Sequence, residues 1–232
     1  SGPARRGLVV SLDGPSSSGK STVGAGAALR LGYRFCDTGM LYRAVTWLAV
    51  ERGVDLEDEG VLVALVPDVE LTADAQGRMT RVVVGRTDVT ERVHVPEVDR
   101  HVSQVARHRA LRAALLPRQR ELAEGGRIIM AGRDIGTVVL PQADLKLYLH
   151  VSLRERARRR AQERGGPLGR HELERMEAEL RRRDELDSSR ASAPLRIPDG
   201  ATVIESDGKS VEQTIEAVVT AIRERAVALG RG

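Results

Sequence analysis

The segment from Gly14 to Ser21 carries the most specific chemical pattern in the chain. It reads Gly14-Pro15-Ser16-Ser17-Ser18-Gly19-Lys20-Ser21 and matches G-x-x-x-x-G-K-[ST] in full. Glycines at these positions let successive backbone N–H groups surround phosphate oxygens, and a following helix adds its positive N-terminus. In such a loop the lysine reaches the β- and γ-phosphates, and the serine hydroxyl is a ligand of Mg²⁺. The segment, together with Thr22, therefore predicts a site for a nucleoside triphosphate and its Mg²⁺.

Several classes of protein share this loop. A GTPase needs base-reading and switch motifs that the sequence does not show, and a motor or unwinding ATPase is usually larger than 232 residues. A small kinase needs only an acceptor pocket and a lid that keeps water from the γ-phosphate. A nucleic-acid-binding module that uses the triphosphate as a structural or regulatory ligand is the alternative from a different class.

Strands and helices alternate along most of the chain. Apolar runs predict strands over 7–13, 33–36, 128–131, 145–151 and 202–204. Helical periodicity predicts helices over 19–31, 40–52, 57–65, 96–107, 110–124 and 210–226. The first strand precedes the phosphate loop and the first helix follows it, as that loop requires. The alternation predicts an α/β fold with a doubly wound parallel sheet of about five strands.

Two segments depart from this alternation. Residues 67–95 alternate between apolar and polar side chains around glycine-containing turns, which predicts a small antiparallel β insertion. Residues 154–190 hold twelve arginines and nine acidic residues and break at 165–169 into two helices. Composition alone favours a solvated helical hairpin, and the functional alternative is a mobile lid that brings cations to phosphates. We expect a core domain of residues 1–66, 96–153 and 191–232, an acceptor-binding insertion of residues 67–95, and a lid of residues 154–190.

The composition excludes several kinds of protein. Charged residues make up 30% and hydrophobic residues 41%, and no stretch approaches the ~20 apolar residues of a membrane span. Five scattered aromatic residues do not form a platform on which nucleic-acid bases could stack. The single cysteine, Cys36, fits a reducing compartment. We expect a cytoplasmic monomer that binds small molecules and neither nucleic acid nor a membrane.

Four further motifs resemble those of bacterial cytidylate kinases. In the family's order and spacing they are Asp37–Arg43, Ser103–Ala106, Gly132–Val139 and Arg183–Arg190, followed by Ala193-Pro194-Leu195. The Gly-Arg-Asp-x-Gly-Thr motif and its three companions are far more specific than the phosphate loop. The resemblance extends from Leu8 to Ile222, with Met40 where the family often has alanine and Ser17 where it often has glycine. The lid between Arg164 and Met176 does not match in detail.

The resemblance implies a reaction and a set of site residues. The γ-phosphoryl group of ATP would pass to CMP or dCMP, giving ADP and CDP or dCDP, with Mg²⁺ bound through ATP at Ser21. The cytosine edge would be read by Ser103, Arg112 and Asp134, and the ribose by Asp187. The acceptor phosphate would be bound by Arg43, Arg133 and Arg190, in a pocket also lined by Ser16, Asp37, Tyr42 and Arg183. The catalytic group would comprise Lys20, Arg133 and Asp134 with the lid arginines Arg156, Arg160 and Arg183.

Some of these assignments depend wholly on the resemblance. Asp37 at the end of a strand could simply cap the following helix. A single arginine such as Arg112 is more often a surface residue than a ligand. Within the kinase class, UMP, AMP or a non-nucleotide acceptor is the alternative to CMP.

Overall fold

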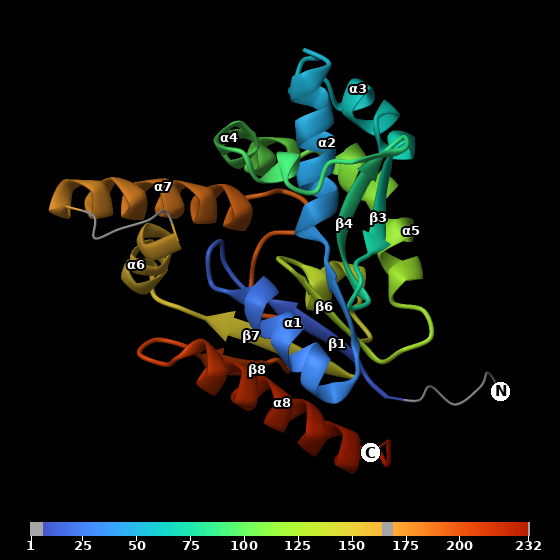
Figure 1. The fold of residues 1–232 in the computed structure, drawn as a ribbon, viewed down its shortest axis with the longest axis vertical. Helices are drawn as coiled ribbons and strands as arrows, with labels where there is room; N and C mark the ends of the chain where they lie inside the picture. The colour runs from blue at the N-terminus through green and yellow to red at the C-terminus, as the bar shows by residue number, and fades with distance from the viewer. Residues whose placement is uncertain (1–6, 164–168, 232) are drawn as a thin grey trace.

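The computed structural model describes residues 7–163 and 169–231 as one eight-stranded sheet with helices on both faces (Figure 1). The strand order is β3-β4-β2-β6-β1-β7-β8, with β5 paired to β4. The strands are β1 Val9–Asp13, β2 Arg34–Asp37, β3 Val69–Ala73, β4 Arg78–Val84, β5 Thr87–Asp88, β6 Ile128–Gly132, β7 Leu145–His150 and β8 Thr202–Glu205. Every pair from β4–β2 to β7–β8 is parallel. The predicted α/β fold class with a mainly parallel sheet is confirmed.

The helices divide into two layers. They are α1 Lys20–Leu31, α2 Gly39–Glu51, α3 Glu59–Ala64, α4 Pro96–Val105, α5 Arg109–Leu122, α6 Leu153–Glu163, α7 Arg170–Ser188 and α8 Val211–Ala228. Alternate side chains of β1 point to opposite faces of the sheet, as strand geometry requires. Val10 and Leu12 belong to the apolar cluster that includes α1 and α8, whereas Val9 belongs to the cluster that includes α2, α4 and α5. The sheet is therefore buried on both faces.

Residues 67–95 do not form a sheet of their own. β3 and β5 pair antiparallel with β4, as the alternating pattern predicts. β4 also pairs in parallel with β2, through Phe35 with Arg78 and Cys36 with Met79. The five expected strands are present as β1, β2, β6, β7 and β8, and the insertion extends the same sheet, because β4 satisfies the backbone groups along the edge of β2.

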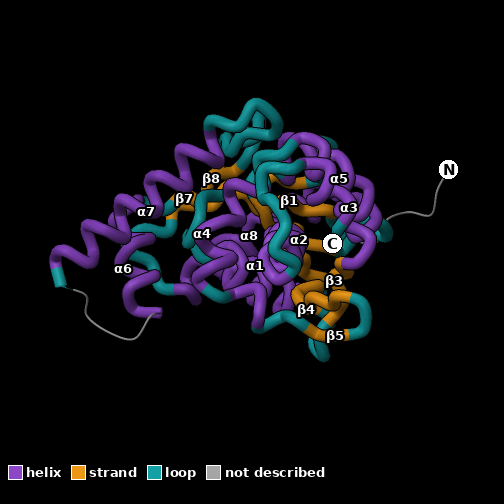
Figure 2. Tube along the Cα trace, turned by 90° about the horizontal axis from the view of Figure 1, so that it is seen from above, coloured by secondary structure: helices purple, strands orange, loops and turns teal. Residues whose placement is uncertain are grey.

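The hairpin of α6 and α7 projects away from the sheet (Figures 1 and 2). It has a small apolar core of its own, formed by Ala157, Ala161, Met176 and Leu180. Most of the predicted break at 165–169 lies outside the described residues. None of the described helices combines the length and the hydrophobicity needed to cross a membrane.

Candidate active site

A cavity of about 500 Å³ opens at the carboxyl ends of β1, β2 and β6 and reaches the α6–α7 hairpin. Parallel α/β sheets bind ligands at this edge, because the loops that follow the strands meet there. Most of the predicted site residues line this one cavity: Ser16, Ser17, Ser18, Gly19, Lys20, Ser21, Thr22, Asp37, Tyr42, Arg43, Ser103, Arg112, Arg133, Asp134, Arg160, Arg183, Asp187 and Arg190. Gly14, Pro15 and Arg156 are the predicted residues that do not line it.

The phosphate loop turns directly from β1 into α1. Gly19 caps α1 with a φ of 87°, a left-handed conformation that glycine adopts without steric cost. Ser17, where we noted the departure from glycine, has a φ of 57°, which costs a non-glycine residue about 1–2 kcal/mol. Lys20 Nζ donates to the carbonyl of Pro15 at 2.7 Å and to Ser18 Oγ at 3.2 Å. Burial and the nearby Arg133 lower the pKa of Lys20 well below its usual value.

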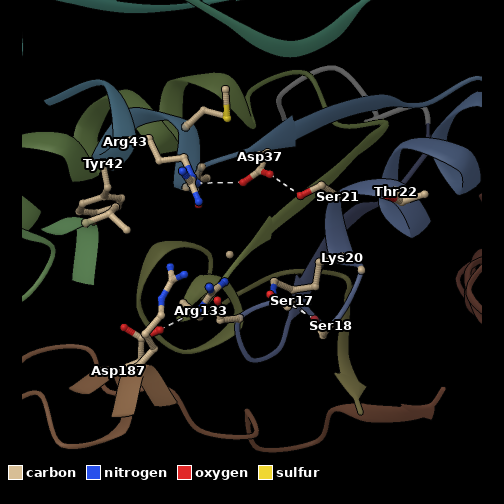
Figure 3. A pocket seen from close by; sticks show the side chains of 18 of the residues that line it. Ser17, Ser18, Lys20, Ser21, Thr22, Asp37, Tyr42, Arg43, Arg133 and Asp187 are labelled. Carbon is tan, nitrogen blue, oxygen red and sulfur yellow. Dashed lines mark hydrogen bonds and ion pairs between the residues drawn. The ribbon is translucent and has the colours of Figure 1, made fainter. Parts of the chain in front are cut away.

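Asp37 stands at the end of β2 and touches the phosphate loop. Its carboxylate accepts a hydrogen bond from Ser21 Oγ (Figure 3). It also accepts one from the backbone N–H of Gly39 at 3.0 Å, at the first residue of α2. Asp37 therefore accepts from the first backbone N–H of α2 and also faces the serine that we expected to bind the metal.

One end of the cavity is closed by a buried ion pair. Arg112 Nη2 on α5 donates to Asp134 Oδ2 at 2.6 Å, and Arg112 Nη1 donates to the carbonyl of Ala106 at 3.0 Å. The guanidinium lies over the ring of Tyr42, 5.1 Å from its centroid. Ser103 of α4 is buried at the same wall. Burial raises the pKa of Tyr42 to about 12. This end can therefore offer a carboxylate, guanidinium donors and a hydroxyl to a polar ring.

Beside this pair, Arg133 and Arg190 contact Asp187, and Arg183 lines the cavity with them. Arg133 Nε donates to Asp187 Oδ2 at 3.0 Å, and Figure 3 shows this contact across the cavity from Lys20. Arg183 and Arg190 are buried, yet Nε and Nη1 of Arg183 and Nη2 of Arg190 have no hydrogen-bond partner. Burial and Arg133 lower the pKa of Arg183 to about 10. Burial acts to raise the pKa of Asp187, but Arg133 and Arg190 outweigh it and hold that pKa below its usual value. Buried N–H donors without acceptors are costly, so this cluster is suited to an anion.

The lid arginines have different surroundings from one another. Arg156 is buried away from the cavity, where it pairs with Asp184 at 2.5 Å and donates to the carbonyl of Ser16 at 3.0 Å. It joins α6, α7 and the phosphate loop, and its expected direct contact with the transferring group stays a prediction. Arg160 lines the cavity, and so does Arg159, which the sequence reading missed. Arg159 and Arg160 lie three and four positions after Arg156, so the three side chains share one helix face. This spacing could have indicated Arg159 from the sequence.

Arg159 marks a further part of the cavity near the start of α8. Its Nη2 donates to the carbonyl of Ser206 at 2.6 Å, and Ser206 and Thr214 line the cavity beside it.

The predicted insertion of residues 67–95 contributes little to this cavity. Among the described residues it contributes only His94 to the lining. The wall around the Arg112–Asp134 pair is built from α2, α4, α5 and α7, and the acceptor-binding role of residues 67–95 stays a prediction.

Asp13 is a second residue that the sequence reading missed. It ends β1, is fully buried, and accepts hydrogen bonds from the backbone N–H groups of Ile135 at 2.8 Å and Gly136 at 2.7 Å. These two contacts hold the turn that carries Arg133 and Asp134 against the start of the phosphate loop. Burial raises the pKa of Asp13 to about 6, although the two N–H donors act in the opposite direction.

Comparison with known proteins gives one family over nearly the whole chain. The family model described as cytidylate kinase matches residues 10–224. A cytidylate kinase of Geobacillus kaustophilus (strain HTA426) is 43% identical over 226 residues, covering 95% of this chain and 99% of the relative. A cytidylate kinase of Roseiflexus castenholzii (strain DSM 13941 / HLO8) is 44% identical over 225 residues, covering 94% of each chain.

Proposed function

The chain belongs to the cytidylate kinase family and transfers the γ-phosphoryl group of ATP to CMP or dCMP, and we propose how its residues divide that task. ATP extends from the phosphate loop toward the wall formed by Arg159, Ser206 and Thr214. The lining of one continuous cavity supports this course. The backbone N–H groups that follow Gly14, the positive end of α1 and Lys20 then hold the triphosphate.

Cytosine occupies the end of the cavity that the Arg112–Asp134 pair closes. Its exocyclic amino group is a donor that a carboxylate such as Asp134 accepts, and its O2 and N3 atoms are acceptors. The donors for these atoms are Arg112, whose Nε has no hydrogen-bond partner, and the Ser103 hydroxyl. A base that lacks this pattern leaves buried polar groups unpaired, which is a strong basis for rejecting it.

The acceptor phosphate lies among Arg43, Arg133, Arg183 and Arg190, with Asp187 near the ribose. The observation that carries this assignment is the set of buried N–H groups of Arg183 and Arg190 without hydrogen-bond partners, although Arg190 Nη2 lies 3.6 Å from Asp187 Oδ1. Phosphate oxygens satisfy such donors with short, charge-assisted bonds, and guanidinium forks suit them geometrically.

The donor atoms at the end of the phosphate loop suit Mg²⁺. The Ser21 hydroxyl and the Asp37 carboxylate are in contact, and oxygen is the ligand type that this cation prefers. We assign the Ser21 hydroxyl to bind the cation and Asp37 to orient that hydroxyl. Asp37 then belongs to the metal site more than to the acceptor site. When bound, Mg²⁺ neutralises charge on the β- and γ-phosphates.

Catalysis consists of positioning and charge stabilisation. The acceptor phosphate is largely ionised at neutral pH, so no side chain needs to remove a proton from it. Lys20 stabilises the negative charge on the transferring group, and Arg160 and Arg183 approach the same group from the hairpin. Arg156 acts indirectly, because it ties the hairpin to the carbonyl of Ser16.

The α6–α7 hairpin serves as the lid. Its few apolar contacts and its projection from the sheet support this role (Figure 1). Closure of such an element excludes water, so that the γ-phosphoryl group reaches CMP and is not hydrolysed. A monomeric state and a cytoplasmic location stay predictions.

Two measurements test this division of the site. Coupled detection of ADP with CMP, dCMP, UMP, AMP or no acceptor should give fast turnover with CMP and dCMP only. Calorimetric titration should show that CMP binds at least ~100-fold more tightly than cytidine, since charge-assisted bonds contribute about 1.5–3 kcal/mol each. Equal affinity for cytidine and CMP would contradict the phosphate site, and faster turnover of AMP or UMP would contradict the cytosine site.

A further inference from the structure

Asp99 on α4 touches arginines from two other helices. Its Oδ1 accepts a hydrogen bond from Arg43 Nη2 of α2 at 2.6 Å, and its Oδ2 accepts one from Arg160 Nη2 of α6 at 3.1 Å. Both arginines line the cavity. Asp99 is not one of the described residues that line it. The carboxylate lies behind the two guanidinium groups, so it can act on a bound nucleotide only through them.

The contacts of Arg160 extend this connection to the phosphate loop. Its Nη1 donates to Ser17 Oγ at 3.3 Å, and its Nη2 lies 3.5 Å from Glu179 of α7, whose side chain is 43% exposed. A continuous set of contacts therefore runs from Ser17 through Arg160 and Asp99 to Arg43. It links the loop that holds the donor phosphates to an arginine assigned to the acceptor phosphate.

Positive charge exceeds negative charge around Asp99. Burial acts to raise the pKa of Asp99, but Arg43, Arg160 and Arg183 together hold it below its usual value. The carboxylate is therefore ionised at neutral pH. The partly buried carboxylate of Asp99 and the half-exposed Glu179 do not neutralise three guanidinium groups, so the arginines keep the capacity to bind an anion.

We propose that Asp99 is a positioning residue for phosphoryl transfer, which holds Arg43 and Arg160 in the orientation that the two reacting phosphates require. The proposal rests on the proposed function, which assigns Arg43 to the acceptor phosphate and Arg160 to the transferring group. Because two oxygens of one carboxylate hold both arginines, their separation is set before nucleotides bind. Preorganised charges lower the barrier, since little reorganisation remains for the reaction step.

Asp99→Asn tests the proposal with minimal change in size. The amide keeps one acceptor oxygen but turns an NH₂ group toward one of the arginines. We expect kcat/KM for CMP to fall at least ~10-fold, mostly through kcat, because the misplaced contacts matter most in the transition state. Asp99→Glu keeps the charge and should recover part of the loss. Glu97→Gln is the matched control, because Glu97 lies in the same helical turn and pairs with Arg100 at the surface.

A mutant cycle separates positioning from simple support of the fold. When Arg43→Ala and Arg160→Ala are already present, Asp99→Asn should cause almost no additional loss of kcat/KM. An equal loss in both backgrounds would overturn the proposal. A rise in kcat/KM for Asp99→Asn alone would also overturn it, because the carboxylate would then compete with substrate for the arginines.

The same variants distinguish this proposal from the assignment of the site. If Arg43→Ala and Arg160→Ala impair CMP turnover while Asp99→Asn does not, the role of Asp99 is wrong and the site assignment stands. If the arginine variants also turn over CMP normally, both the site assignment and the role of Asp99 are wrong.

Discussion

Replacing Arg112 by methionine should damage recognition of CMP and leave recognition of ATP nearly unchanged. Methionine keeps most of the side-chain length and removes every guanidinium donor. The Arg112–Asp134 pair spans 2.6 Å, with exposed side-chain fractions of only 8% and 6%. Losing one partner of such a buried pair leaves an uncompensated charge, which costs about 3–5 kcal/mol of stability. Typical domains are stable by about 5–15 kcal/mol, so the variant should fold at moderate temperature.

The kinetic effect follows from the position of the pair at the acceptor end. Without Arg112, bound cytosine loses a donor, and Asp134 loses the contact that fixes its carboxylate. The KM for CMP should rise at least ~10-fold, equivalent to about 1.4 kcal/mol, while the KM for ATP should stay within about twofold. Steady-state rates with each nucleotide varied in turn measure both constants.

Arg118→Met is the matched control for this change. Arg118 lies on the same helix but donates to the carbonyls of Val66 and Val69, at 2.8 and 2.6 Å. It should lose stability, as seen in chemical denaturation, and keep its KM for CMP. Equal rises in the KM values for ATP and CMP in Arg112→Met would refute the reasoning, since Arg112 would then support the fold without reading the base.

Three further predictions follow from single buried groups. Lys20→Ala should lower kcat at least ~10²-fold with little change in melting temperature, because it removes a charge from the transferring group; near-normal turnover would contradict the donor site. Cys36→Ser should leave kcat unchanged but cost about 1–3 kcal/mol in denaturation, because the site is fully buried and burial already raises the pKa of the thiol; a loss of kcat in the folded variant would count against the mechanism. Asp13 should make stability depend on pH, because burial raises its pKa from 3.8 to about 6 in the folded protein. Its protonated form stabilises the fold at low pH, and this contribution is lost as the pH rises through about 6. The unfolding free energy of the protein relative to Asp13→Asn should therefore be about 1 kcal/mol greater at pH 5 than at pH 7; a pH-independent difference would disprove the shift.

The sequence predicted those parts of the molecule whose structure depends on residues close by in the chain. The phosphate loop between a predicted strand and a predicted helix is one example, and β1 and α1 lie where the pattern placed them. The site residues taken from the family motifs gather in one cavity, with the exceptions of Gly14, Pro15 and Arg156. The order of the motifs was sufficient here, because parallel strands bring the loops after β1, β2 and β6 to the same edge.

Side-chain partners could not be derived in this way. Arg156 and Arg160 both come from the arginine-rich stretch, and nothing in their local sequence distinguishes the one that is tied to Asp184 from the one that lines the cavity. The contacts of Asp13 and Asp99 could not be predicted for the same reason. Their partners lie more than one hundred residues away for Asp13, and on α2 and α6 for Asp99.

The sequence by itself therefore determined the loop, the order of strands and helices, and the chemical types that meet at the site. Only the tertiary structure decided that β4 joins the edge of β2, that α2, α4, α5 and α7 line the cavity around the Arg112–Asp134 pair, and which arginines face the cavity. The physical reason is the range of the interactions. Backbone conformation depends on nearby side chains and turns, whereas a buried charge takes its partner from whichever distant element the packing of the core brings beside it.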